Sequence, residues 1–291
     1  MGRKRFFLKV LCFFGLGTFI QWLQADWALA WGPGVHTLTA LHLMGHLKEI
    51  LPAIAGAVTA YPFEYLYGCM AADFFIGKGK KKADSHPHHW EGGFQFLAEA
   101  RDDQERSYAY GFLSHLAADV AAHHIFIPKM LSLFPPGNRM GHLYWELKAD
   151  YWIGTDYTQL ANRVLKMDHP NCDAILGLIG GKSRGRMSAS KLLYTQSVKF
   201  TGFVNANREA IWGMRAPRWP LFEQYLALTL DLSCRLVQDI LTRPGESSCL
   251  RFDPMGKVPI ESACHKWFSR RLRKPANRLE PFVIDPDLLK L

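Results

Sequence analysis

Apolar side chains recur every three or four positions along most of the chain, which is the spacing of an α-helix with one buried face. This pattern predicts helices over residues 37–50, 51–60, 62–75, 94–101, 105–124, 140–167, 175–179, 188–203, 207–214 and 221–241. The sequence contains no strand-like alternation of useful length. We therefore predict an all-α fold, built as a single multi-helix domain with extra helices toward the C-terminus.

The first thirty residues follow a secretory pattern. A basic start is followed by the apolar run 10–20, and Ala28-Leu29-Ala30 is a small-x-small cleavage sequence. The apolar run is shorter than the about 20 residues that span a bilayer. We predict a signal peptide over residues 1–30, cleavage between Ala30 and Trp31, and a secreted or periplasmic protein. The folded domain would cover 31–242, and the Pro- and charge-rich residues 243–291 would form a loosely packed extension.

Charge and cysteine content narrow the function only slightly. The chain has 35 Lys and Arg against 26 Asp and Glu, and residues 1–30 hold four of the former and one of the latter, so the mature charge is +6. That bias is too small to name a partner. Export permits disulfides, and Cys249 with Cys264 is one pairing that the sequence leaves undecided. The sequence carries no glycine-rich phosphate loop and no nucleophile elbow.

Residues 111–150 concentrate the chemistry. His115, Asp119 and His123 are spaced four apart, and at about 100° per residue they fall within about 80° of one helix face. Such a face can hold a metal ion. His124 points about 180° from His115 on the same helical wheel, so His123 is the better ligand candidate.

A second helix repeats this relation. His142 and Glu146 are four residues apart, and Asp150 follows one turn later, either as another donor or as a partner that orients His142. Burial of the carboxylates among apolar neighbours would be costly without a cation or a proton. A metal site is therefore favoured over a set of ordinary core histidines.

Two other histidine groups differ in their neighbours. His86, His88 and His89 lie together in a loop before Trp90, which is the composition of a ligand loop. The preceding basic loop, 77–82, is either a solvated connector or an attractor of phosphate. The residues His42 and His46 are four apart without a carboxylate, so we interpret them as structural histidines.

The order of these donors resembles the zinc-dependent phospholipase C family, whose fold is shared with single-strand-specific zinc nucleases. The resemblance covers about residues 31–165 and rests on Trp31, His36, Asp73, His88, His115, Asp119, His123, His142 and Glu146.

The resemblance implies an all-α domain with about three Zn²⁺ ions. Asp73, His88, His115 and Asp119 would hold one ion, and His123, His142 and Glu146 a second. The third would take the α-amine and carbonyl oxygen of Trp31 together with His36, with Asp119 bridging it to the first ion. Asp73 would also be the candidate general base.

The resemblance leaves some alternatives open. In His88-His89-Trp90-Glu91 the family pattern favours His88, but His89 also precedes an aromatic residue and stays a candidate. His124 stays an alternative to His123, because the family's spacing after the aspartate is longer.

The leading function is cleavage of glycerophospholipids to diacylglycerol and a phosphorylated head group, with phospholipid as the partner and transient contact with a membrane surface. The alternatives are a single-strand nuclease or other phosphodiesterase, and a non-catalytic periplasmic zinc-binding protein. The sequence indicates no obligate protein partner.

Overall fold

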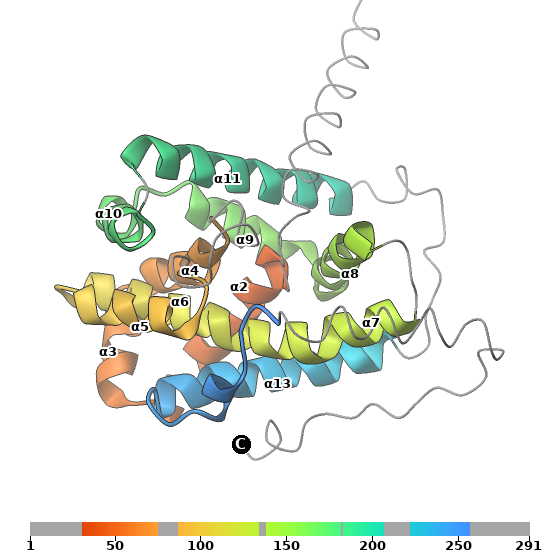
Figure 1. Cartoon of the computed structure of the whole chain (residues 1–291), viewed down its shortest axis with the longest axis horizontal. Coiled ribbons are helices and arrows are strands. Elements are labelled where there is room, and N and C mark those ends of the chain that lie inside the picture. The colour runs from red at the N-terminus through yellow and green to blue at the C-terminus, as the bar shows by residue number, and fades with distance from the viewer. Residues whose placement is uncertain (1–30, 75–86, 134–137, 182, 207–221, 257–291) are drawn as a thin grey trace, which may run out of the picture.

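Helices form the whole fold within the residues that the computed structural model describes, which are 31–74, 87–133, 138–181, 183–206 and 222–256 (Figure 1). The α-helices are α2 (Pro33–Gly45), α3 (Pro52–Ala60), α4 (Pro62–Ala71), α5 (Trp90–Glu99), α6 (Asp103–Ala121), α7 (Ile127–Leu133), α8 (Asn138–Ile153), α9 (Thr155–Leu165), α10 (Pro170–Ile179), α11 (Arg184–Ala206) and α13 (Phe222–Thr242). Four short helices are η1 (Leu47–Glu49), η2 (Ala72–Phe74), the π-helix η4 (Ala122–Phe126) and η5 (Ser248–Arg251). The predicted all-α fold is confirmed.

The starts of several helices follow from local sequence. The helices α2, α3, α4 and α10 each begin with proline, which lacks the N–H that the first turn would leave unpaired. At the start of α6, the side chain of Asp102 accepts a hydrogen bond from the Glu105 amide at 2.9 Å.

The central helix is α6, around which α3, α4, α5 and α13 pack. Every residue of α6 from Ser107 to Ala121 is buried, as expected of a helix in the core rather than on the surface. It continues through η4 into α7 across the middle of Figure 1. The donors His115 and Asp119 are therefore held on the most enclosed element of the fold.

Two glycines let α4 and α6 approach backbone to backbone. A Cβ on Gly111 would lie 2.1 Å from the carbonyl oxygen of Tyr65, and one on Gly68 would lie 2.1 Å from that of Tyr108. Both distances are far below van der Waals contact, so each position requires glycine. The close crossing brings the C-terminal end of α4 beside His115.

The structure corrects two of the predicted helix boundaries. The single helix predicted over 140–167 is two helices, because Gly154 has a φ of 104° between Ile153 at the end of α8 and Thr155 at the start of α9. The first helix begins at Pro33 rather than near His36.

Part of the predicted C-terminal extension is packed against the domain. The Cys249 side chain of η5 is fully buried, and Met255 is only 4% exposed. The division into a domain over 31–242 and an extension over 243–291 stays a prediction. The remaining residues of the extension, 257–291, lie outside the described residues, as do the signal peptide 1–30 and the basic loop 77–82.

The four described cysteines, Cys69, Cys172, Cys234 and Cys249, are buried and form no disulfide with one another. Cys264 lies outside the described residues, so the Cys249–Cys264 pairing stays a prediction.

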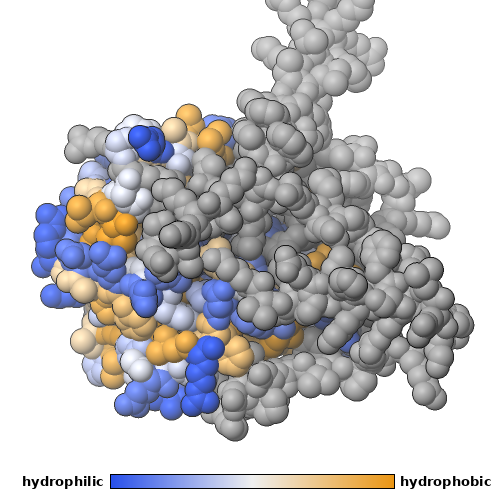
Figure 2. Space-filling model, in the orientation of Figure 1, coloured by the Kyte–Doolittle hydropathy of each residue, from blue (hydrophilic) through white to orange (hydrophobic). Residues whose placement is uncertain are grey.

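Where the visible face is coloured by hydropathy, apolar and polar residues are intermingled (Figure 2). The most exposed large apolar side chains are Leu178 on α10, Leu192 on α11 and Leu228 on α13. Within the described residues, no helix is both long enough and apolar enough to cross a bilayer. Contact with a membrane surface stays a prediction.

Candidate metal centre

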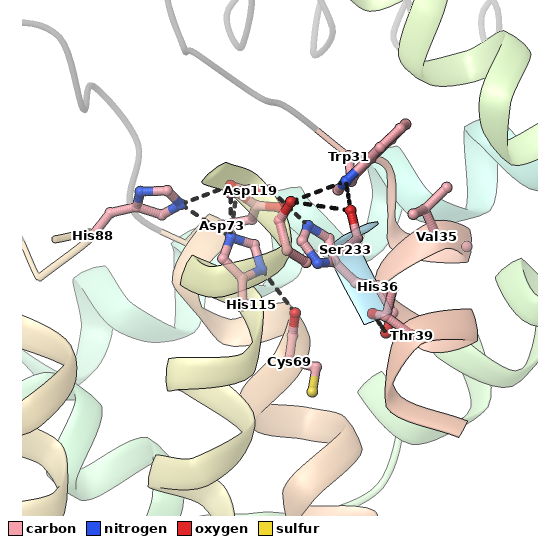
Figure 3. Close-up of polar contacts among 12 residues, drawn as sticks. Trp31, Val35, His36, Thr39, Cys69, Asp73, His88, His115, Asp119 and Ser233 are labelled. Atoms are coloured by element: carbon pink, nitrogen blue, oxygen red, sulfur yellow. Dashed lines mark hydrogen bonds and ion pairs between the residues drawn. The ribbon is translucent and has the colours of Figure 1, made fainter. Parts of the chain in front are cut away.

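Five buried donors from four segments of the chain meet at one place (Figure 3). They are His36 on α2, Asp73 on η2, His88 in the loop before α5, and His115 and Asp119 on α6. None of the five is more than 3% exposed. The structure thus brings together five of the nine donors on which the family resemblance rests.

Asp119 lies at the centre of this cluster. Its Oδ1 is 3.3 Å from Nε2 of His36, while its Oδ2 is 3.2 Å from Nε2 of His115 and 3.2 Å from Nε2 of His88. The two oxygens of one carboxylate therefore face two different sets of imidazole rings. This arrangement suits a carboxylate that is shared between two cations.

The remaining distances define two overlapping groups of three donors. His36, Asp73 and His115 form one group, and His88, His115 and Asp119 form the other, with the donor atoms of each group within 4.8 Å of one another. Nε2 of His115 is 3.8 Å from Oδ1 of Asp73, and the rings of His36 and His115 stack at 3.9 Å.

Neighbouring groups fix the orientation of the donors. Nδ1 of His115 is 2.8 Å from the carbonyl oxygen of Cys69. Because a carbonyl only accepts, Nδ1 carries a proton and donates, and this bond turns Nε2 toward Asp119. No sequence pattern indicated this role of Cys69, because its backbone carbonyl accepts the hydrogen bond and its side chain takes no part.

Trp31 is anchored beside the cluster by its indole ring. Its Nε1 donates hydrogen bonds to the carbonyl oxygen of Ala118 at 3.1 Å and to Oγ of Ser233 at 3.0 Å, and the ring packs on Phe126. Ala118 directly precedes Asp119 in α6, so the indole of Trp31 is hydrogen-bonded to the residue next to the one that carries the central carboxylate. Its proposed role as a ligand through the α-amine stays a prediction.

Asp150 has a role that the sequence did not indicate. Its two carboxylate oxygens accept hydrogen bonds from the amides of Gly34 at 3.0 Å and Val35 at 2.9 Å. Asp150 thereby caps α2, whose preceding residue Gly32 has no side chain to do so. Burial raises the pKa of Asp150 to about 7, although these two amides oppose the shift.

The protonation states at the centre suit a metal. Burial alone would raise the pKa of Asp119, but the charges and hydrogen bonds of His115 and His36 hold it well below its usual value. Burial and the nearby His115 lower the pKa of His36, which Asp119 only partly offsets. A metal needs an ionised carboxylate and neutral imidazoles, so neither residue must lose a proton at neutral pH.

The donor chemistry also fits zinc. Nitrogen and carboxylate oxygen donors are ligands that zinc takes in proteins. Nδ1 of His36 is buried and has no hydrogen-bond partner among the described residues. A cation among these donors would compensate the buried charge of Asp119.

The second predicted zinc site is only partly described. His123 is fully buried in η4, and Glu146 is 4% exposed on α8, but neither belongs to the two donor groups found among the described residues. His142 lies in α8, and its side chain is outside the described residues. The assignment of His123, His142 and Glu146 to one ion stays a prediction.

The members of the two ambiguous histidine pairs have different surroundings. His88 faces Asp119, whereas Nδ1 of His89 accepts a hydrogen bond from the Gly92 amide at 3.2 Å and caps α5. His89 therefore caps a helix and is absent from the two donor groups found among the described residues, and its place among the ligand candidates stays a prediction. Nε2 of His124 is 2.8 Å from the carbonyl oxygen of Asp253, and the choice between His123 and His124 as a ligand stays a prediction.

A family model described as zinc dependent phospholipase C matches residues 35–180. The chain belongs to this family. The matched region runs from α2 to the end of α10 and contains every donor of the cluster, so the protein is a zinc-dependent, phospholipase C-like hydrolase. No curated protein and no solved structure matches the chain.

Proposed function

We propose that the protein is an exported phospholipase C that cleaves glycerophospholipids to diacylglycerol and a phosphorylated head group. Family membership and the buried His and Asp cluster support this proposal. Its single strongest support is Asp119, whose two oxygens face His36 on one side and His88 with His115 on the other. A carboxylate shared in this way favours a cluster of ions over one isolated ion.

The proposed centre holds about three zinc ions. Asp73, His88, His115 and Asp119 would hold the first, and His123, His142 and Glu146 the second. Trp31 and His36 would hold the third, with Asp119 shared. Bound zinc would supply Lewis acidity toward the phosphoryl group.

The chain itself would supply orientation and a proton acceptor. Hydrogen bonding to the Cys69 carbonyl fixes the ring of His115, and the α2 cap by Asp150 fixes the helix that carries His36. We propose Asp73, 3% exposed and 3.8 Å from His115, as the carboxylate that accepts a proton during hydrolysis.

Export is part of the proposal because the α-amine of Trp31, a proposed zinc ligand, is free only after the signal peptide has been removed. Removal of residues 1–30 would create a free α-amine at Trp31, whose side chain is hydrogen-bonded to the residue before Asp119. Before cleavage, the same nitrogen is an amide and cannot bind a metal. The proposal therefore gives signal-peptide cleavage a chemical purpose.

The experiment is a two-substrate assay of the protein that begins at Trp31. We expect release of diacylglycerol from phosphatidylcholine and no cleavage of single-stranded DNA. A His115→Ala variant should lose activity, and His42→Ala is the matched control because His42 is exposed on α2. Cleavage of DNA without lipid would establish the nuclease alternative, and a zinc-loaded protein inactive on both would overturn the enzymatic proposal.

A further inference from the structure

A short turn near the end of the described chain lies against two histidine-bearing segments. We call residues 252–256 the C-terminal turn. The Gly256 amide donates to the carbonyl oxygen of Asp253 at 3.0 Å, and the Met255 amide donates to Oδ1 of Asp253 at 2.9 Å. In Figure 1 the dark blue chain leaves η5 and crosses in front of α6. The turn lies outside the region that matches the family, 35–180.

The turn is bound to the π-helix η4 through His124. Nε2 of His124 donates to the carbonyl oxygen of Asp253 at 2.8 Å, and its ring meets the Phe252 ring edge to face at 5.5 Å. A π-helix is a rare interruption that is frequent at functional sites. His124 directly follows His123 in η4, so its contacts with the turn hold the helix segment that carries His123.

The turn also touches His123 itself, at Gly256. A Cβ on Gly256 would lie 2.6 Å from Cβ of His123 and 3.4 Å from its Nδ1. The backbone of Gly256 therefore packs directly against the His123 side chain. Gly256 has a φ of 58°, which side chains other than glycine rarely adopt. Both the conformation and the contact therefore require glycine here.

A third contact reaches the start of α5, two residues after His88. Nε1 of Trp90, the first residue of α5, donates to the carbonyl oxygen of Phe252 at 2.8 Å. The turn thus contacts η4, which bears His123, and the first residue of α5, which follows His88 by two positions. His88 and His123 would bind different zinc ions in the proposed centre.

We propose that the C-terminal turn positions His123 for zinc, so that residues outside the family region complete the metal centre. The inference rests on the proposed function only in taking His123 as a zinc ligand. The Gly256 contact limits where the His123 side chain can lie, and the His124 hydrogen bond holds the π-helix that presents it. Such supporting contacts typically change metal affinity by about 10- to 100-fold when removed.

The test compares Gly256→Ala with Gly181→Ala in the protein that begins at Trp31. Gly181 has the same φ of 58°, but nothing lies within 4 Å of a Cβ built there, so it controls for backbone strain alone. Zinc affinity is measured by competition with a chromophoric chelator. We expect one zinc equivalent to bind about 10- to 100-fold more weakly in Gly256→Ala, and all equivalents to keep their affinity in Gly181→Ala.

Variants at His124 keep the inference testable even if Gly256→Ala does not fold. His124→Ala should weaken the same zinc equivalent and alter the visible spectrum of the Co²⁺-loaded protein, whereas His124→Gln keeps an N–H donor and should restore both. The inference would be overturned if zinc affinity fell equally in Gly256→Ala and Gly181→Ala. It would also be overturned if the zinc affinity and the Co²⁺ spectrum of His124→Ala equalled those of wild type.

These readouts do not depend on catalysis. If the wild-type protein cleaves neither lipid nor DNA while Gly256→Ala loses zinc affinity, the proposed function fails and the inference stands. If lipid is cleaved and the Gly256→Ala zinc affinities equal those of wild type, the inference fails and the function stands.

Discussion

The crossing of α4 and α6 offers a quantitative prediction for Gly111→Ala. The new Cβ would lie 2.1 Å from the carbonyl oxygen of Tyr65 and 2.9 Å from the amide nitrogen of Cys69. Both are backbone atoms of α4 and cannot rotate away. The helices must therefore separate, and the separation would also move the Cys69 carbonyl away from His115.

The expected cost follows from these distances. The Cβ falls about 1.3 Å short of ordinary van der Waals contact with the Tyr65 oxygen. Overpacking of this kind costs about 1–3 kcal/mol, and so severe a contact belongs at the upper end. Replacing a helical glycine by alanine contributes about 1 kcal/mol in the opposite direction. We expect the free energy of unfolding to fall by about 2 kcal/mol, and zinc affinity to fall by about 10-fold as the Cys69 hydrogen bond lengthens.

The assay is urea unfolding of the zinc-free protein together with competitive zinc titration. The matched control is Gly56→Ala in α3, where nothing lies within 4 Å of the new Cβ, and which should gain up to about 1 kcal/mol. If Gly111→Ala were as stable as wild type, or gained stability as Gly56→Ala should, the close crossing would not be what positions His115.

Three further changes probe the N-terminus, the α2 cap and a buried histidine away from the metal centre. An alanine added before Trp31 should remove about one zinc equivalent and leave the helical circular dichroism unchanged, because the α-amine becomes an amide. Asp150→Ala should lower the free energy of unfolding by about 1–2 kcal/mol at pH 8, because the amides of Gly34 and Val35 lose their acceptor. Protonation of His169 should lower the free energy of unfolding of the zinc-free protein as the pH falls below 6.5. Burial lowers its pKa from 6.5, an effect to which Lys191 adds and which Val164, Glu64 and Asp173 oppose, so the unfolded state binds the proton first.

Each of these three has its own control. Equal zinc content in the processed and the extended protein would remove Trp31 from the ligand set. Asp150→Asn keeps one acceptor and should lose less stability than Asp150→Ala; equal losses would argue against the capping role. For His169, the stability difference between wild type and His169→Gln should change by no more than about 1.4 kcal/mol per pH unit, because one proton is involved. A difference that stayed constant from pH 5 to pH 8 would contradict the assignment.

The part of the centre that could be predicted from the sequence is the part that one helix fixes by itself. The spacing of His115 and Asp119 placed both on one face, because a regular helix turns by about 100° per residue. The burial of these residues also followed, since carboxylates in an apolar helix indicate a compensated interior site. The meeting of His36, Asp73 and His88 with this face depends on tertiary packing, and only the family resemblance indicated it.

Other features could not be predicted because they depend on contacts distant in the sequence or on small local changes. The choice between His88 and His89 depends on where α5 begins, since His89 becomes its cap. The wheel argument for His124 assumed a regular helix, but η4 is a π-helix. Asp150 caps a helix more than a hundred residues earlier, a contact that no local pattern reveals.

The central claim is that Asp119 is shared within a cluster of zinc ions. The most direct test is elemental analysis of the protein that begins at Trp31, purified without chelator, alongside Asp119→Asn. We predict about three zinc ions per chain for the former and a loss of at least two for the latter, because both oxygens of Asp119 face donor groups. One zinc ion or none in the wild-type chain, or an unchanged zinc content in Asp119→Asn, would contradict the account.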